Sequence, residues 1–138
     1  MDGYIRVYSI TLCACVRIWK SSGKIPLSCR FSHNGKWIIV TCDDGLMDII
    51  DVGDAKVIRS LIIDAYTIDA CFSPNDRRFA VVDRTGGFSL WDVDDLGKES
   101  LTVLRIDNIE PFTVQYLEND EIRVVGKYSD KNYGNENY

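Results

Sequence analysis

The fold is decided by Arg30–Val52 (RFSHNGKWIIVTCDDGLMDIIDV), which aligns without a gap to Cys71–Val93 (CFSPNDRRFAVVDRTGGFSLWDV). The offset is 41 residues, as from Phe31 to Phe72. Each copy predicts an apolar strand, a polar turn, a second apolar strand, a turn at a glycine and a third strand that ends in Asp-Val. A unit repeated at this spacing predicts an array of short antiparallel β-meanders.

The period falls within the roughly 40–45 residues per blade of WD-repeat β-propellers, and the chain resembles that family. Trp91-Asp92 matches the signature dipeptide, whereas Ile50-Asp51 keeps the aspartate and replaces the tryptophan. The resemblance implies an all-β fold of four-stranded antiparallel blades. The positions that carry this structural motif are Phe31, Gly45, Asp51, Phe72, Gly86, Trp91 and Asp92.

The flanking segments extend the repeat in both directions. Residues 2–9 resemble the glycine turn and third strand of an earlier unit, and residues 112–125 resemble the first two strands of a later one. With the four strands of a blade lettered a to d, the chain is predicted to run c and d, then abcd, abcd, and finally a and b. The repeats fall at about 1–26, 27–66, 67–107 and 108–127, within a single segment 1–127. The polar residues 128–138 are expected to be disordered.

About three blades are too few for a ring, because propellers close with roughly 4 to 8 blades. Two interpretations stay open. In the first, two copies supply six blades and strands a and b of one chain pair with strands c and d of the other, in a symmetric homodimer. In the second, the sequence is a fragment of a larger propeller, and the missing portion completes the ring. Both interpretations predict a protein partner.

The chain departs from the family in the buried polar network that usually holds a WD blade together. Asp44 occupies the turn position in one repeat, but Cys42 and Ile50 stand where a hydroxyl residue and the tryptophan belong. In the next repeat Trp91 is present, but Asp83 stands where the hydroxyl residue belongs and Thr85 stands where the aspartate belongs. We therefore expect apolar packing to stabilise the blades, with Trp91 largely buried. The residues expected to alternate inward are Ile38, Val40, Ile49, Phe79, Val81 and Leu90.

The composition is that of a soluble globular protein: 138 residues are 46% hydrophobic and 27% charged. With 16 basic and 21 acidic residues, the net charge is −5. A negative surface repels phosphate backbones and anionic lipids, so neither nucleic acid nor a membrane is expected as a partner. No stretch reaches the roughly 18–20 apolar residues that span a bilayer.

The thiols predict neither disulfides nor a metal site. The five cysteines are an odd number without a paired CxxC spacing, and the single histidine, His33, leaves too few ligands for a structural zinc site. We expect reduced thiols, no metal and no cofactor. Together with the family resemblance, this predicts an intracellular, cytoplasmic protein, with the nucleus as the other compartment considered.

Catalytic motifs are missing from the sequence. His33 falls in a predicted turn without a nucleophile beside it, and neither GxGxxG nor GxxxxGK[ST] occurs. The paired carboxylates also fall at predicted turns, where solvated side chains are the rule. We predict that the protein is not an enzyme. A propeller enzyme or small-molecule binder is the alternative from another class.

The resemblance implies a scaffold that binds other proteins through the b–c and d–a loops on one face. Tyr66 and Arg84 are the predicted anchors, because aromatic and arginine side chains contribute most binding energy at interfaces. The acidic loop residues favour a partner with basic residues. The alternative is a fragment of a larger structural protein of cytoskeletal, ciliary or ribosome-assembly machinery. The predicted partner-binding residues are Asp43, Asp44, Asp64, Tyr66, Arg84 and Thr85, with Asn108, Glu110 and Pro111 on the same face.

Overall fold

The computed structural model describes residues 3–20, 25–63, 66–94 and 102–128, and these residues form β-strands joined by turns. The strands fall into four antiparallel sheets, here called sheets I to IV. Sheet I contains β1 (Tyr4–Ser9) and β2 (Ala14–Lys20). Sheet II contains β3 (Pro26–Phe31), β4 (Trp37–Cys42), β5 (Leu46–Asp51) and β6 (Lys56–Ile62). Sheet III contains β7 (Thr67–Phe72), β8 (Arg78–Asp83), β9 (Gly87–Asp92) and β10 (Thr102–Arg105). Sheet IV contains β11 (Ile109–Tyr116) and β12 (Ile122–Tyr128).

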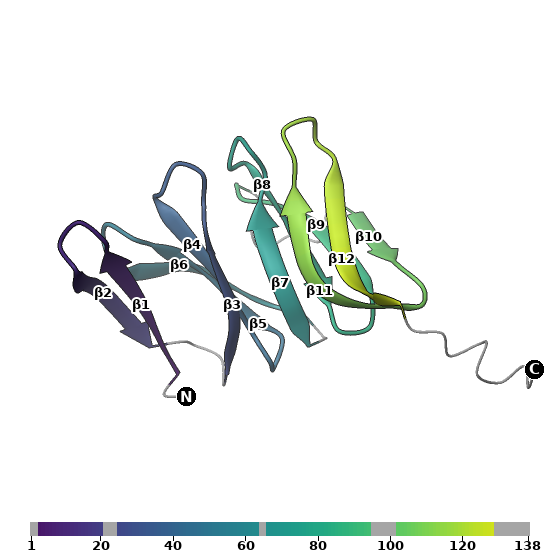
Figure 1. Ribbon diagram of the computed structural model, residues 1–138, viewed down its shortest axis with the longest axis horizontal. Coiled ribbons are helices and arrows are strands. Elements are labelled where there is room, and N and C mark those ends of the chain that lie inside the picture. Colours follow the sequence, from purple (N-terminus) through teal and green to yellow (C-terminus); the bar gives the residue numbers. More distant parts are fainter. Residues whose placement is uncertain (1–2, 21–24, 64–65, 95–101, 129–138) are drawn as a thin grey trace, which may run out of the picture.

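The four sheets have two, four, four and two strands, which confirms the predicted all-β class and the order of strands along the chain. Within each sheet, strands that follow one another in sequence are neighbours, so every sheet is a simple meander. The sheets follow one another in a row, from sheet I beside the N-terminus to sheet IV at the other end (Figure 1). Residues 129–138, where disorder is expected, lie outside the described residues.

The repeated Ser and Asn residues build the same turn in both four-stranded sheets. Ser32 Oγ accepts a hydrogen bond from the Trp37 N–H (3.0 Å), and Asn34 Oδ1 accepts one from the Lys36 N–H (3.0 Å). Ser73 and Asn75 make the equivalent bonds at 3.0 Å each. These side chains satisfy backbone donors that a tight turn leaves without partners. Their recurrence at an offset of 41 residues is therefore a local requirement of the turn.

The turn between β8 and β9 depends on a glycine. Gly86 has a φ of +89°, and a Cβ there would lie 2.3 Å from the Ile106 carbonyl oxygen. The Asp83 carboxylate closes the same turn by accepting bonds from the N–H groups of Thr85 (2.8 Å) and Gly87 (3.0 Å). A side chain at position 86 would thus be strained and would collide with the backbone.

Both faces of sheets II and III are buried, because each sheet stacks between two others. Alternate residues of β4 face opposite neighbours: Ile38 packs toward sheet I, and Ile39 packs toward sheet III. The predicted inward residues therefore do not share one face, and Leu90 is only half-buried. The cluster between sheets II and III contains Ile39, Met47, Ile49, Ala70, Phe72, Phe79 and Val81. The cluster between sheets III and IV contains Cys71, Ala80, Val82, Phe88 and Val114.

Two of the motif residues are not fully buried. Trp91 packs at the margin of the cluster between sheets II and III, where it is partly rather than fully buried. It stacks on Phe79 with ring centroids 6.3 Å apart, and its Nε1 donates to Ser89 Oγ at 2.8 Å. Phe31 is 52% exposed, because sheet I has no strand that covers this part of β3.

Besides the apolar packing that we expected, a polar network links the first strands of sheets II, III and IV. Its centre is Asp69 on β7, which is buried. Its carboxylate accepts hydrogen bonds from Ser28 Oγ (2.6 Å), Arg30 Nη2 (2.6 Å) and Thr113 Oγ1 (2.7 Å). It also accepts the Val114 N–H at 3.1 Å. These hydrogen bonds compensate the free-energy cost of burying the Asp69 carboxylate.

A second carboxylate joins the turns of two neighbouring sheets. Asp76 accepts hydrogen bonds from the N–H groups of His33 (2.8 Å) and Asn34 (2.9 Å). The His33 ring Nδ1 lies 3.1 Å from the same carboxylate. The exposed His33 is thus part of a contact between sheets II and III, which the sequence did not indicate.

Candidate interaction site

The first strands of sheets II, III and IV share a bulge near their start. The pairing register shifts between Pro26 and Ser28, between Thr67 and Asp69, and between Pro111 and Thr113. Each shift leaves one apolar residue without a paired neighbour, namely Leu27, Ile68 or Phe112. Bulges bend a strand and redirect the side chain that they leave unpaired.

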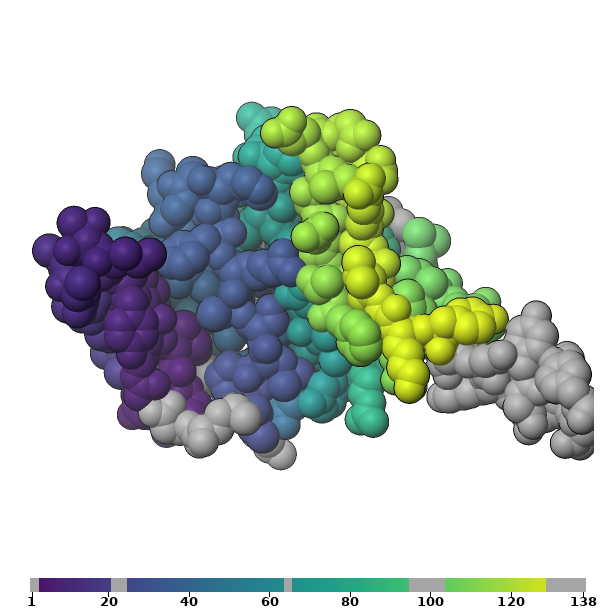
Figure 2. Space-filling model, in the orientation of Figure 1, coloured from purple at the N-terminus to yellow at the C-terminus, as the bar shows by residue number. Residues whose placement is uncertain are grey.

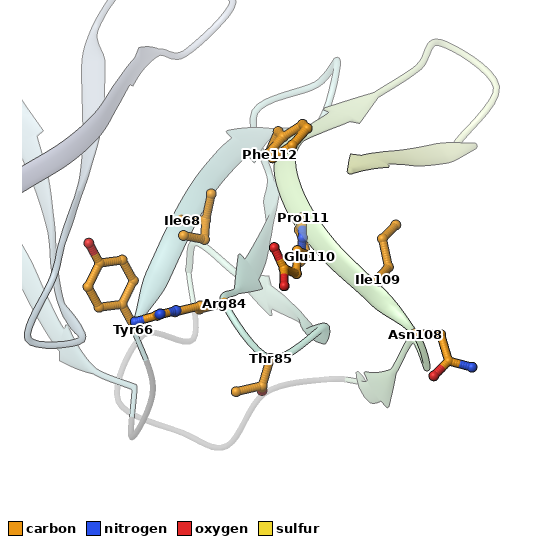
Figure 3. Close-up of a pocket in the computed structure, with 9 residues that line it drawn as sticks. All are labelled: Tyr66, Ile68, Arg84, Thr85, Asn108, Ile109, Glu110, Pro111 and Phe112. Carbon is orange, nitrogen blue, oxygen red and sulfur yellow. The ribbon is translucent and has the colours of Figure 1, made fainter. Parts of the chain in front are cut away.

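Two of the bulged residues line a cavity of about 760 Å³ between sheets III and IV. Tyr66 and Ile68 reach it from β7 and the segment before it, and Arg84 and Thr85 reach it from the turn between β8 and β9 (Figure 3). The opposite wall is the beginning of β11 and the residue before it. It consists of Asn108, Ile109, Glu110, Pro111 and Phe112.

Arg84 and Tyr66 form the charged and aromatic corner of this cavity. The Arg84 N–H donates to the Tyr66 carbonyl oxygen at 2.8 Å, which fixes the turn against the start of β7. The Arg84 guanidinium lies over the Tyr66 ring, 5.5 Å from its centroid. Among the described residues Arg84 makes no ion pair. The ring thus holds the guanidinium in place at this corner of the cavity.

Thr85, in the same turn, is fixed by hydrogen bonds on two sides. Its N–H and Oγ1 both donate to Asp83 Oδ1, at 2.8 and 2.6 Å. Arg105 Nη1 donates to the Thr85 carbonyl oxygen (3.2 Å) and to its Oγ1 (3.0 Å). These contacts use up the polar groups of Thr85, so it shapes the cavity more than it offers hydrogen bonds.

The wall formed by β11 is held close to β12. Pro111 is buried, and a Cβ at Gly126 would lie 2.3 Å from the Glu110 carbonyl oxygen, so the two strands approach closely there. Phe112, on the bulge, is 62% exposed. The Glu110 side chain extends from the same wall toward the space in front of Arg84 (Figure 3). The cavity thus combines apolar walls with one cation and one anion.

The structure brings together three of the predicted partner-binding residues and leaves two apart. Tyr66, Arg84 and Thr85 line the cavity, together with the predicted Asn108, Glu110 and Pro111. Asp43 and Asp44 lie in the equivalent turn of sheet II and do not line it. Their carboxylates accept the Ile25 N–H (3.1 Å) and the Leu46 N–H (3.2 Å). Asp64 lies outside the described residues.

Sequence reasoning missed Ile68, Ile109 and Phe112, which form most of the apolar lining. Ile68 and Phe112 belong to strands in which successive side chains are expected to alternate between the two faces of the sheet. The bulges interrupt that alternation, and no residue type marks a bulge in these strands. An exposed phenylalanine next to a proline in β11 is the one local signal that could have drawn attention to this wall.

A smaller hollow of about 300 Å³ contains both His33 and Cys71. Burial raises the pKa of the Cys71 thiol to about 11, and the nearby Arg30 guanidinium only partly offsets this rise. The thiol therefore stays protonated at neutral pH, and the thiolate is the reactive form of cysteine. Within the described ranges, no three His, Cys, Asp or Glu residues cluster as a metal site would require.

Comparison with protein-family models and with curated protein sequences finds no match for this chain. Within the part of the chain that the structure describes, no helix is long and apolar enough to cross a bilayer.

Proposed function

We propose that this protein is a non-enzymatic protein-interaction scaffold, that its sheets are WD-repeat-like propeller blades, and that the cavity between sheets III and IV is the centre of its partner site. One observation carries the proposal: loop residues from two sheets, distant in sequence, surround one open cavity with an arginine held over a tyrosine. Cavities with apolar walls and a few fixed polar groups are typical binding sites.

The WD-like character rests on features that recur in successive sheets. Sheets II and III share a turn built by Ser and Asn side chains, and sheets II, III and IV share a bulge near the start of the first strand. The free thiols of Cys42 and Cys71 support a reducing compartment, and we propose the cytoplasm.

The chemistry of the cavity defines the partner. An apolar side chain of the partner would lie between Ile68 and Phe112, where two exposed or half-exposed apolar groups face solvent. Arg84 would bind a carboxylate or carbonyl group of the partner, because a guanidinium over an aromatic ring still presents its donors. Basic residues of the partner would lie near Asp43 and Asp44 in the next turn.

The test is selection of a random displayed-peptide library on the immobilised full chain, followed by rebinding to variants. We expect the selected peptides to lose at least about tenfold in affinity with the double variant Arg84→Glu, Tyr66→Ala, because both anchors are removed. The matched control is Lys36→Glu, Arg77→Ala, which alters exposed turns between first and second strands. Circular dichroism of each variant shows whether the fold is kept.

Peptides that bind the Arg84/Tyr66 double variant as tightly as they bind the unchanged chain would place the site elsewhere. Peptides that lose affinity only with the Lys36/Arg77 control would place it at the opposite turns. A library that yields no specific binder would argue against a peptide-binding scaffold.

A further inference from the structure

We infer that β12 of one copy of the chain pairs with β1 of a second copy, so that sheets IV and I combine into one four-stranded sheet. This surface is distinct from the cavity of the proposed function, and the inference goes beyond it. In the described residues, the outward edges of both strands lack a neighbouring strand. The two sheets lie at opposite ends of the row, so the pairing is between molecules (Figure 2).

Sheet I has the structure of the last two strands of a four-stranded sheet. The β1–β2 register shifts between Val7 and Tyr8, and the β5–β6 register shifts between Ile49 and Ile50. Before the shift, Val7 pairs with Arg17, just as Ile49 pairs with Arg59. The strand pair β1–β2 therefore matches β5–β6, including its irregularity.

Sheet IV has the structure of the first two strands. Its register shift between Pro111 and Thr113 matches the shift between Thr67 and Asp69 at the start of sheet III. On β12, Ile122 and Val124 pack toward sheet III, and the equivalent residues of β8 pack toward sheet II. Sheet IV is thus the half that sheet I lacks, and sheet I is the half that sheet IV lacks.

Apolar side chains are exposed where the missing halves would lie at the sheet IV end. Leu104 on β10 is 59% exposed, although it pairs with the buried Phe88, because no third or fourth strand of sheet IV covers it. Val125, on β12 of sheet IV, is 52% exposed. A second copy that adds β1 and β2 beside β12 would cover Leu104.

The sheet I end shows the complementary exposure. Phe31 on β3 is 52% exposed, whereas Phe72, at the same position of β7, is buried by sheet II. Sheet IV of another copy, joined to sheet I, would lie against Phe31 as sheet II lies against Phe72. Each end therefore exposes the apolar groups that the strands of the other end would cover.

The register follows from sheet II, where Ile38 pairs with Ile50 and Thr41 pairs with Met47. Transferred to the ends, these pairs place Ile122 beside Tyr8 and Val125 beside Ile5. In both pairs, apolar residues on the same face of the combined sheet become neighbours.

Two copies close the arrangement, since each molecule donates one edge to each of two identical junctions. The result is a twofold-symmetric dimer of six sheets, within the roughly 4 to 8 of closed propellers. Closure also pairs the four outward edges of the two copies, and unpaired edges otherwise favour aggregation.

Light scattering of the full chain over a dilution series tests the association. We expect a mass of twice 15.7 kDa that falls to the monomer value on dilution. Val125→Lys should weaken the dimer at least about tenfold, because it places a charge at the junction. The matched control Ile58→Lys, on the outer strand β6, should leave the mass unchanged. Both side chains are exposed in the single chain, so the fold should survive, as circular dichroism would show.

Disulfide trapping tests the register. In a background with Cys13, Cys15 and Cys29 changed to Ser, Tyr8→Cys with Ile122→Cys should give a covalent dimer on mild oxidation. The displaced pair Arg6→Cys with Ile122→Cys should give at least about tenfold less, because diagonal neighbours are about 7–8 Å apart. Denaturing electrophoresis without reductant measures both yields.

A chain that stays monomeric at every concentration would overturn the inference. So would a dimer that Val125→Lys leaves intact, or one in which the displaced pair is trapped as well as the matched pair. None of these outcomes bears on peptide binding at Arg84 and Tyr66, so the two proposals fail separately.

Discussion

Phe31 and Phe72 occupy the same position in two sheets of the same strand order, yet Phe31 is 52% exposed and Phe72 is 2% exposed. Both are the last residue of the first strand and precede the same Ser-containing turn. The difference is the neighbouring sheet: sheet II covers Phe72, but sheet I has no strand that reaches Phe31. A repeat therefore specifies where a side chain points, and the next repeat decides whether the side chain is buried.

The same contrast holds for a polar position. Ser28 and Asp69 are equivalent residues of β3 and β7, but only Asp69 lies between two other first strands. It binds Ser28 and Arg30 on one side and Thr113 on the other. The junctions of sheet III are thus held by packing and by this hydrogen-bond network, whereas β3 has no first strand beside it on the side of sheet I.

The largest expected effect is at the buried aromatic ring. Phe72→Ala should lower the free energy of unfolding by about 3–5 kcal/mol, because it leaves a cavity against Trp37 and Phe79, whose ring centroids lie 6.2 and 6.3 Å away. Phe31→Ala should cost about 1 kcal/mol or less when both are measured in the Val125→Lys background, where no second copy contributes. Urea denaturation followed by circular dichroism measures both. Equal losses would show that the two positions do not differ as described.

The next effect is at the polar network. Asp69→Ala should cost about 3 kcal/mol, because it leaves the Arg30 guanidinium and the Thr113 hydroxyl without their shared acceptor. Ser28→Ala removes one donor and should cost about 1 kcal/mol. Thermal unfolding of the two variants at one pH compares them. A loss at Asp69 no larger than that at Ser28 would contradict a central role for this carboxylate.

Trp91 should matter less than its place in the repeat signature suggests. The ring is half-buried and stacks on Phe79, so Trp91→Ala should cost about 2 kcal/mol, less than a fully buried aromatic deletion. Trp91→Phe keeps the stacking and should recover more than half of the loss. If Trp91→Ala proved as damaging as Phe72→Ala, Trp91 would have to be fully covered in solution.

The smallest effect is a difference in the rate at which the thiols are alkylated. At pH 8 iodoacetamide should modify the exposed Cys13 and Cys15 of sheet I well before Cys71, because burial raises the pKa of Cys71 to about 11. Mass spectrometry of the alkylated chain gives the order. As the pH rises toward 11, the Cys71 thiolate forms and alkylation there should accelerate, and the stability that the neutral buried thiol provides should be lost. Early modification of Cys71 at pH 8 would mean that the junction of sheets III and IV opens readily.

The strand order could be predicted because its signals are local. Ser32, Asn34, Ser73 and Asn75 bond backbone groups of their own turns, and Gly86 adopts a positive φ that a side chain disfavours. Such requirements recur wherever the turn recurs, so one chain aligned with itself reveals them. The resemblance to WD repeats, in turn, placed Tyr66, Arg84 and Thr85 in loops on one face, and all three line the same cavity.

What escaped prediction involves contacts between sheets. Ile68 and Phe112 line the cavity because bulges turn them out of the regular alternation. The Asp69 network joins residues that are 39 to 45 positions apart in the sequence. The sequence around any one of these residues carries no signal that predicts its partners.

For the part of the chain that the structure describes, the sequence by itself determined the strands and their meander order, since short-range hydrogen bonds and backbone conformation impose these features. Only the tertiary structure decided which face of each sheet is covered, which aspartate becomes the centre of a network, and which loop residues surround a cavity. Burial and solvation depend on the neighbouring surface, and the side chains of that surface come from residues far along the chain.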